Sequence, residues 1–294
     1  MQKEILITGA NGFVGRVVHK NLKNRGYVVH GVDKYDGDIP LTKLDLKQAS
    51  TEQLISLFQN KTVIHLAAIS SVDDCVKNPT LAFEVNCSVI SKIVDAVNQT
   101  NSELIFASTE WVYPENNSKE IIHSENFNLN LNSINQLYSL TKLIGEWYIQ
   151  KNCAKKFAIL RFGIIYGERM EPQSVFEKIV YSIFFNKELK FGSPETSRRF
   201  INVLDIADGI ANLLEKGLTN RLYNLAGNDL VSIGNLLDKT SSILGKSIQP
   251  TFLNANPSIR NPLSDRFYNE FNWKPTISTE TGIERLIKYY DKIK

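Results

Sequence analysis

Near the N-terminus the chain reads Ile5-Leu6-Ile7-Thr8-Gly9-Ala10-Asn11-Gly12-Phe13-Val14-Gly15. Its first residues are β-prone, its middle is a glycine-rich turn, and apolar residues then recur at helical spacing as far as Lys23. The stretch therefore predicts a strand, a tight turn and a helix. Glycines in such a turn leave backbone N–H groups open to a phosphate at the helix N-terminus, where the helix dipole favours negative charge. We expect a dinucleotide pyrophosphate to bind there.

The glycines follow a Gly-x-x-Gly-x-x-Gly spacing, which places the first two one residue further apart than in the usual dinucleotide fingerprint. Alone, this pattern also fits a strand-to-helix connection without a ligand. However, a second apolar segment, residues 27–32, ends in Asp33, at about the distance expected of a ribose-binding carboxylate. A carboxylate accepts hydrogen bonds from a free 2′-hydroxyl and repels a 2′-phosphate. The sequence thus favours NAD over NADP, and Lys34 beside Asp33 weakens that preference.

The composition is that of a globular protein, with 294 residues, 43% hydrophobic and 22% charged. The chain enters its first strand without a secretory leader pattern, and it has no apolar run of membrane-spanning length. We therefore expect a cytoplasmic protein that does not insert in membranes. The cysteines Cys75, Cys87 and Cys153 are widely spaced, which predicts neither a disulfide framework nor a thiolate metal site but buried small residues.

The charged and potentially metal-binding residues predict neither a catalytic metal nor a nucleic-acid partner. The four histidines lack any metal-ligand spacing, so we expect no catalytic metal. The net charge of +3 is small and the basic residues are spread along the chain, which argues against nucleic acid as a partner. A small-molecule enzyme remains the leading class.

Strands and helices are predicted to alternate through the first half. Helices are expected at 51–59, 80–99 and 134–151, strands at 62–66, 104–107 and 157–162, and a short strand end at 44–46. This pattern indicates an α/β fold with a doubly wound parallel sheet, in which ligands bind at the carboxyl ends of the strands. Gly9, Asp33, Ala67 and Ser108 are predicted to lie at such ends.

The second half predicts a looser, mixed region. Helices are expected at 174–185, 205–216, 232–243 and 279–292, and short strands at 189–191, 200–203 and 223–225. We therefore expect a dinucleotide-binding domain over 1–167. A smaller substrate domain is expected over 168–294, with some of its segments returning to the core of the first.

Tyr138 and Lys142 are the strongest candidates for chemistry. They are four residues apart on a predicted helix, so they project from one face. A cation beside a phenol stabilises the phenolate and lowers its pKa from about 10, as a general base near neutrality requires. The spacing alone also fits a solvated helix face. Together with the glycine turn and with Ser108-Thr109 at a strand end, it favours catalysis.

These motifs resemble the extended short-chain dehydrogenase/reductase superfamily, and within it the NAD-dependent epimerase/dehydratase family that acts on nucleotide sugars. The resemblance spans nearly the whole chain. It rests on Thr8-Gly9-x-x-Gly12-x-x-Gly15, Asp33, His65-Leu66-Ala67-Ala68, Ser108-Thr109, Tyr138-x-x-x-Lys142, Leu160-Arg161-Phe162, Arg198-Arg199-Phe200-Ile201-Asn202-Val203-Leu204-Asp205 and Asn272-Trp273-Lys274-Pro275.

The resemblance implies a Rossmann-type fold and a role for each matching residue. Tyr138 is expected to act as acid/base at a sugar hydroxyl, Lys142 to bind the nicotinamide ribose and lower the tyrosine's pKa, and Thr109 to hydrogen-bond the reacting oxygen. Substrate contacts are expected from Ser70, Thr109, Glu110 and Arg198, the last at the diphosphate. Cofactor contacts are expected from Gly9, Asn11, Gly12, Phe13, Val14, Gly15, Asp33, Asp45, Leu46, Leu66, Ala67, Ala68, Ser108, Tyr138 and Lys142.

Two departures from the family pattern narrow the reaction. Dehydratases carry an Asp-Glu pair after the threonine, whereas this chain has Glu110-Trp111, so dehydration is disfavoured. The Arg-x-Phe-Asn motif of many epimerases appears as Arg161-Phe162-Gly163, which removes an amide that often contacts the substrate. The identity of the sugar therefore stays open.

The resemblance favours an NAD-dependent nucleotide-sugar epimerase that transiently oxidises the C4 carbon of a hexose. A nucleoside-diphosphate 4-keto-6-deoxy-sugar reductase would use the same residues, and the sequence does not separate the two. The alternative of another class is a non-catalytic protein that senses dinucleotide, and the intact Thr109, Tyr138 and Lys142 argue against it. A homodimer is also implied, with Ile144, Trp147 and Tyr148 supplying apolar surface between subunits.

Overall fold

The computed structural model describes residues 4–294, and the chain packs as two compact units. The chain passes back and forth between the two units at several points. The expected division into domains at residue 167 stays a prediction. The first unit holds the described residues up to Val112 with Leu129–Arg161 and Ile210–Tyr223, and the second holds Tyr113–Asn128, Phe162–Gly209 and Asn224–Lys294.

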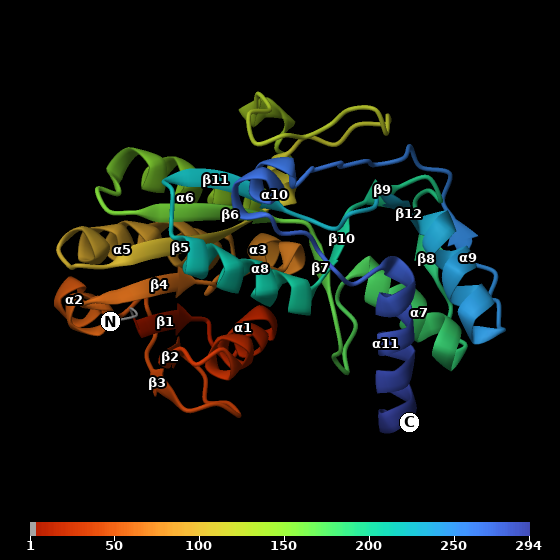
Figure 1. Cartoon of the computed structure of the whole chain (residues 1–294). Helices are drawn as coiled ribbons and strands as arrows, with labels where there is room; N and C mark the ends of the chain where they lie inside the picture. The colour runs from red at the N-terminus through yellow and green to blue at the C-terminus, as the bar shows by residue number, and fades with distance from the viewer. Residues whose placement is uncertain (1–3) are drawn as a thin grey trace. The chain divides into compact units, whose positions relative to one another are not determined.

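A seven-stranded sheet organises the first unit, in the order β11-β6-β5-β4-β1-β2-β3 (Figure 1). The neighbouring pairs from β3 to β5 are parallel, and β1 lies between β2 and β4. The predicted Rossmann-type parallel sheet is confirmed. The strands are β1 (Glu4–Thr8), β2 (Val29–Asp33), β3 (Leu41–Lys43), β4 (Lys61–His65), β5 (Glu103–Thr109), β6 (Phe157–Phe162) and β11 (Arg221–Leu225).

Helices cover both faces of this sheet. The helices α2 (Thr51–Phe58), α5 (Val89–Asn98) and α6 (Leu137–Asn152) lie side by side, α5 in contact with the other two. Their buried side chains join one apolar cluster with β4 and β5. The helix α1 (Phe13–Asn24) contacts β1 and β2, and its buried Val18 and Leu22 lie outside that cluster. This layered packing fixes where the carboxyl ends of the strands are presented.

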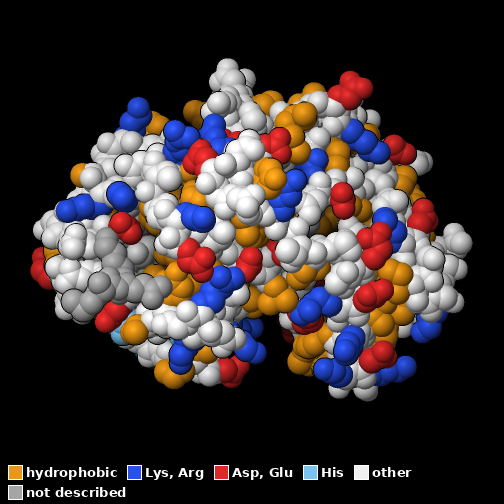
Figure 2. Space-filling view, viewed as in Figure 1, with side chains coloured by type: hydrophobic (Ala, Val, Ile, Leu, Met, Phe, Trp, Pro, Cys, Tyr) orange, Lys and Arg blue, Asp and Glu red, His pale blue; other side chains and the backbone are white. Residues whose placement is uncertain are grey.

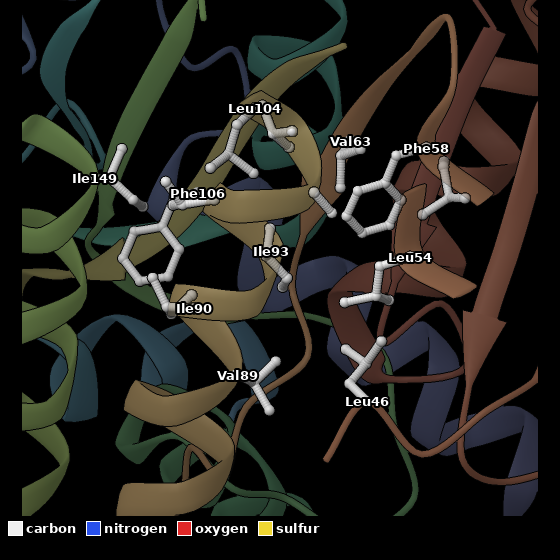
Figure 3. Packing of buried hydrophobic residues seen from close by; sticks show 14 of the residues in the cluster. Leu46, Leu54, Phe58, Val63, Val89, Ile90, Ile93, Leu104, Phe106 and Ile149 are labelled. Carbon is white, nitrogen blue, oxygen red and sulfur yellow. The ribbon is translucent and has the colours of Figure 1, made fainter. Parts of the chain in front are cut away.

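The apolar cluster is built from alternate residues of the strands and from one stripe of each helix. Figure 3 shows Ile90 and Ile93 of α5 beside Leu104 and Phe106 of β5. All four side chains are buried, with exposed fractions of 0 or 1%. Because fully burying each such side chain stabilises the fold by about 1.5–3 kcal/mol, this contact anchors β5, whose last residues carry candidate catalytic groups.

The second unit has its own core. The helices α7 (Val175–Phe185), α9 (Ile233–Leu244) and α11 (Thr279–Ile293) contact one another, and Tyr166 stacks on Phe176 with ring centroids 3.8 Å apart. The remaining elements are β7 (Ile164–Tyr166), β8 (Lys190–Phe191), β9 (Ser197–Arg198), β10 (Phe200–Asn202), β12 (Val231–Ser232), β13 (Thr251–Phe252) and α10 (Asp265–Phe271), with α8 (Val203–Lys216) contributing residues to both units.

The helix expected at 80–99 is wrong in its details. The chain first forms α3 (Val72–Lys77), and Pro79 then opens α4 (Pro79–Phe83), because proline is tolerated only in the first turn of a helix. A π-helical turn η1 (Glu84–Ser88) joins α4 to α5. Apolar spacing predicts helix along this whole stretch, but it does not predict a change in hydrogen-bond register.

Two other expectations also need correction. The third strand is β3, Leu41–Lys43, and the expected strand end at 44–46 follows it as a connection. The helix that carries Tyr138 begins at Leu137 instead of residue 134, because a short 3₁₀ turn at Leu131–Ser133 precedes it. Both differences shift the start of an element without changing the order of elements.

The surface in Figure 2 carries Lys and Arg side chains interspersed with Asp and Glu.

Within residues 4–294, no helix has both the length and the apolar character needed to cross a bilayer.

Candidate active site

The glycine turn between β1 and α1 has the geometry that the sequence predicts. Gly9 adopts a φ of +68°, and a Cβ there would lie 2.7 Å from the backbone nitrogen of Ala67. A Cβ at Gly15 would lie 2.2 Å from the carbonyl oxygen of Gly9. Gly12 is the N-cap of α1, and no side chain caps the helix there and no acidic residue stands in its first turn. The turn therefore presents an uncapped helix N-terminus, which suits a phosphate.

Asp33 ends β2 and reaches back to this turn. Its carboxylate accepts a hydrogen bond from the backbone N–H of Asn11 at 3.0 Å and another from the N–H of Tyr35 at 3.2 Å. Asp33 is half-buried, and Lys34 turns its ammonium over the ring of Tyr35, 4.6 Å from the centroid. The carboxylate is thus held beside the glycine turn, where a ribose-binding acid is required.

Tyr138 and Lys142 lie one turn apart on α6, as predicted. The phenol of Tyr138 is hydrogen-bonded to Thr109, the last residue of β5. The Lys142 ammonium donates to the carbonyl oxygen of Ala107 at 2.9 Å and lies 4.9 Å from the centroid of the Phe106 ring. The structure therefore brings the three predicted catalytic groups, Thr109, Tyr138 and Lys142, together at the end of β5.

The pKa of Tyr138 differs from the sequence-based expectation. Burial raises the pKa of this phenol to about 12, and the hydrogen bond from Thr109 only partly opposes the rise. Burial also lowers the pKa of Lys142 to about 8. The expected depression of the tyrosine pKa is not found, because the loss of hydration of the phenolate outweighs the neighbouring groups.

His65 lies close enough to Lys142 to feel its charge. It is the last residue of β4, it is buried, and its Nδ1 lies 2.7 Å from the hydroxyl oxygen of Thr8. Burial, with a smaller contribution from the charge of Lys142, lowers the pKa of His65 to about 3. The imidazole is therefore neutral at physiological pH and ties the ends of β1 and β4 together.

Asn86 is a buried residue next to the candidate site that the sequence analysis did not single out. It lies in the π-helical turn η1, it is buried, and its amide accepts from the N–H of Ile69 at 2.9 Å and donates to the Ile69 carbonyl at 3.0 Å. It also donates to the hydroxyl of Thr141 on α6 at 3.1 Å. Asn86 thus links the segment after β4 to the helix of Tyr138. A lone asparagine in an apolar helical pattern gives no signal of this role.

The other predicted cofactor residues fall in two groups. Leu66, Ala67 and Ala68 are half-buried after β4, and Ser70 is exposed just beyond them, so all four belong to the segment held by Asn86. Phe13 and Val14 are half-buried in the first turn of α1, and Asp45 is half-buried with its carboxylate accepting from the N–H of Lys47. The side chain of Leu46 is 8% exposed and packs in the apolar cluster (Figure 3), and its contact with the cofactor stays a prediction.

Comparison with known proteins decides the family. The sequence profile described as "NAD dependent epimerase/dehydratase family" matches residues 5–226. The chain belongs to this family.

A putative UDP-glucose 4-epimerase of Methanocaldococcus jannaschii is 28% identical over 306 residues, which covers 97% of each chain. A variant of the UDP-glucuronic acid 4-epimerase of Bacillus cereus, solved with NAD and UDP-4-deoxy-4-fluoro-glucuronic acid, is 26% identical, with a TM-score of 0.86 over 99% of this chain and 100% of that one. The UDP-glucose 4-epimerase of Thermotoga maritima, solved with UDP-glucose, matches with a TM-score of 0.86 at 21% identity over 99% of each chain, which bears on the fold alone.

The family motif around Arg198 belongs to the second unit. The Arg198 guanidinium donates to the carbonyl oxygen of Ser258 at 2.5 Å and to its hydroxyl at 2.7 Å. The carboxylate of Glu115 lies 3.6 Å from Arg198 and 3.0 Å from Arg260. Both arginines are buried, whereas the Glu115 side chain is 48% exposed. Arg198 and Arg260 thus share one exposed carboxylate.

The two departures from the family pattern have structural counterparts. Glu110 follows Thr109 directly and is fully buried. Packing requires glycine at residue 163, because a Cβ there would lie 2.5 Å from the carbonyl oxygen of Arg199. The amide that many family members place in this motif therefore has no room at residue 163.

Metal-ligating side chains do not gather in the described part of the chain: over residues 4–294 no group of three or more His, Cys, Asp or Glu side chains is placed to hold a metal ion. All three cysteines are free. Cys75 and Cys87 are buried as expected, whereas Cys153 is only half-buried.

Proposed function

We propose that this family member is an NAD-dependent 4-epimerase of UDP-linked sugars. The observation that carries the proposal is the meeting of Thr109, Tyr138 and Lys142 at the end of β5, one strand away from β4 and two from the glycine turn of β1. A threonine hydroxyl, a phenol and a lysine at one strand end form an acid/base apparatus for a hydroxyl group. The names of the relatives support UDP as the nucleotide.

The residues of the first unit fit NAD. The turn is so tight that a Cβ at Gly9 or Gly15 would clash with backbone atoms, the helix N-terminus at Gly12 lacks a side-chain cap, and Asp33 offers a carboxylate to a 2′-hydroxyl. When bound, NAD supplies a hydride acceptor and donor. Gly9 to Gly15 would hold its pyrophosphate, Asp33 the adenine ribose and Lys142 the nicotinamide ribose.

The chain's own residues would move one proton in each direction. Tyr138 would take the proton of the sugar C4 hydroxyl and later return it, while the Thr109 hydroxyl holds the same oxygen. A phenol with a pKa near 12 is a poor base at neutrality, so a positive charge must stabilise the phenolate in the complex. Lys142 carries that charge below a pH of about 8.

Arg198 is proposed to bind the diphosphate of the substrate. Its planar guanidinium has the geometry to donate two parallel hydrogen bonds to phosphate oxygens, and these would replace its hydrogen bonds to Ser258 and its ion pair with Glu115. Ser70 and Glu110 remain proposed substrate contacts on the strength of the family resemblance.

Two other functions stay open as alternatives. A 4-keto-6-deoxy-sugar reductase would use Thr109, Tyr138 and Lys142 once per turnover and release oxidised cofactor. A dinucleotide-sensing protein without turnover would need none of their acid/base chemistry, and the intact cluster argues against it.

A homodimer and a cytoplasmic setting are also proposed. Three large apolar side chains are exposed: Trp147 on α6 at 59%, Val76 on α3 at 68% and Phe83 on α4 at 49%. Ile144 and Tyr148 are half-buried, and Tyr148 packs against the apolar cluster. Exposed large apolar groups on neighbouring helices favour a subunit interface, and sedimentation at micromolar concentration tests it. The three free cysteines favour a reducing compartment.

The proposed function is tested by incubating the protein and NAD with UDP-glucose, UDP-galactose, UDP-glucuronate and UDP-N-acetylglucosamine. Proton NMR of the anomeric signals should show at least one sugar converting to its C4 epimer with no net change in NADH absorbance. Net NADH oxidation with a 4-keto sugar would favour the reductase instead. Binding without conversion of any sugar would favour the sensor.

A further inference from the structure

Three consecutive residues at the end of β5 are each held by a different residue of α6. The carbonyl of Ala107 accepts from Lys142, and Thr109 is hydrogen-bonded to Tyr138. Between them, the hydroxyl of Ser108 donates to the carboxylate of Glu146. The three partners Tyr138, Lys142 and Glu146 follow one another at intervals of four residues, so they share one face of the helix.

Gly145 allows this close approach of α6 to β5. A Cβ at residue 145 would lie 2.8 Å from the tip of the Phe106 ring, which belongs to β5. The helix can therefore lie close enough for short polar side chains of the strand to reach it.

Glu146 is itself clamped from the other side. Arg161, in β6, donates from Nε to one carboxylate oxygen at 2.9 Å and from Nη2 to the other at 2.5 Å. The exposed fractions of the two side chains are only 1% for Glu146 and 4% for Arg161. Because a buried ion pair costs much desolvation energy and is often replaceable by apolar residues, stability alone gives little reason for this pair.

Glu146 is also the charged group that offsets the burial of Lys142. Burial lowers the pKa of Lys142, and the groups that oppose this shift are, in decreasing order, Cys87 on η1, Glu146 on α6 and Cys75 on α3. His65 on β4 and Tyr138 on α6 are also close by. Burial raises the pKa of Cys75 and raises that of Cys87 to about 11, so both thiols are neutral near pH 7. His65 and Tyr138 are neutral there as well.

We propose that Glu146 is a positioning residue of the catalytic apparatus. Clamped by Arg161, it holds Ser108, and through the strand end it holds the adjoining Thr109 hydroxyl against Tyr138. Its negative charge, one helical turn from Lys142, keeps the ammonium protonated. The inference rests on the proposed function, in which Lys142 must be charged to stabilise the Tyr138 phenolate.

Glu146→Gln is the direct test, because it keeps the size of the side chain and removes the charge. The high-pH limb of kcat should move to lower pH by about two units, as expected of a unit charge a helical turn away acting through an effective dielectric of about 20. We expect kcat at neutral pH to fall about tenfold and KM to change by less than twofold. Ser108→Ala is the matched control, because it breaks the hydrogen bond between Ser108 and Glu146 but keeps the charge of Glu146. In this variant kcat should fall, and the pH of its high-pH limb should stay unchanged.

A measurement without substrate separates this inference from the proposed function. NMR of ¹³Cε-labelled lysine, with Lys142→Met to assign the signal, reports the pKa of Lys142 directly, and Glu146→Gln should lower it. Because that variant leaves Arg161 buried without its partner, the double variant Glu146→Gln/Arg161→Met guards against misfolding. Its Lys142 pKa should lie between the values of wild type and Glu146→Gln, since removing the Arg161 cation offsets part of the lost carboxylate charge. An unchanged Lys142 pKa in a folded variant overturns the inference even if the enzyme is an epimerase. If the wild-type protein converts no sugar, the proposed function fails while the titration still decides this point.

Discussion

At the scale of single residues, Tyr138 carries the chemistry that the account requires. Tyr138→Phe removes one oxygen and leaves the ring in place, so NAD binding should survive while turnover falls by about a hundredfold to ten-thousandfold. Lys142→Met should differ by weakening cofactor binding as well, because the ammonium is proposed to contact the ribose. Initial rates and calorimetric titration with NAD separate the two effects. Full turnover in Tyr138→Phe would remove the tyrosine from the mechanism.

Asp33 makes a prediction about cofactor choice at the same scale. Its carboxylate is held by the N–H groups of Asn11 and Tyr35 beside the glycine turn. Asp33→Ser should weaken NAD binding and improve NADP binding relative to NAD, since the substitution removes both the ribose hydrogen bonds and the repulsion of a 2′-phosphate. Titration with both cofactors measures the ratio. A wild-type protein that prefers NADP would contradict this role of Asp33.

At the scale of elements, the turn between β1 and α1 depends on glycine where backbone atoms approach closely. Gly15→Ala would bring a Cβ to 2.2 Å from the carbonyl oxygen of Gly9, a contact that forces the turn to shift. We expect a loss of about 1–3 kcal/mol or more in the free energy of unfolding, together with weaker NAD binding. Gly234→Ala is the control, because its Cβ would meet Pro194 at an ordinary 3.5 Å. Equal stability of the two variants in urea would count against this packing.

The same elements show what the sequence can predict. The strand, turn and helix of residues 5–24 are readable because periodicity and glycine spacing agree locally. Likewise, the Tyr138 and Lys142 pair needs only helical spacing to bring its side chains to one face. The strand β3 and the π-helical turn that carries Asn86 are not readable, since they depend on contacts with distant parts of the chain. For the same reason the pKa of Tyr138 follows its burial, which spacing does not reveal.

At the scale of the whole molecule, His65 links stability to pH. Its pKa is about 3 in the folded chain and near 6.5 when unfolded, so the unfolded state binds the additional proton between these values. The stabilisation that comes from neutral His65 is complete above pH 6.5 and is lost as pH falls toward 3. Urea unfolding at pH 7 and pH 5 should therefore show wild type losing about 2 kcal/mol more than His65→Asn. Parallel losses in the two proteins would mean that His65 is not buried as described.

The central claim is that the sugar is oxidised at C4 and reduced again within one active site. The most direct test uses a UDP-hexose that the enzyme converts, labelled with deuterium at C4, with the epimeric product examined by NMR and mass spectrometry. If Tyr138 and NAD act at C4 as proposed, the product keeps its deuterium at C4, solvent hydrogen does not enter, and Tyr138→Phe forms almost no product. Loss of the deuterium to solvent, or its retention at an unchanged C4 configuration, would contradict the account.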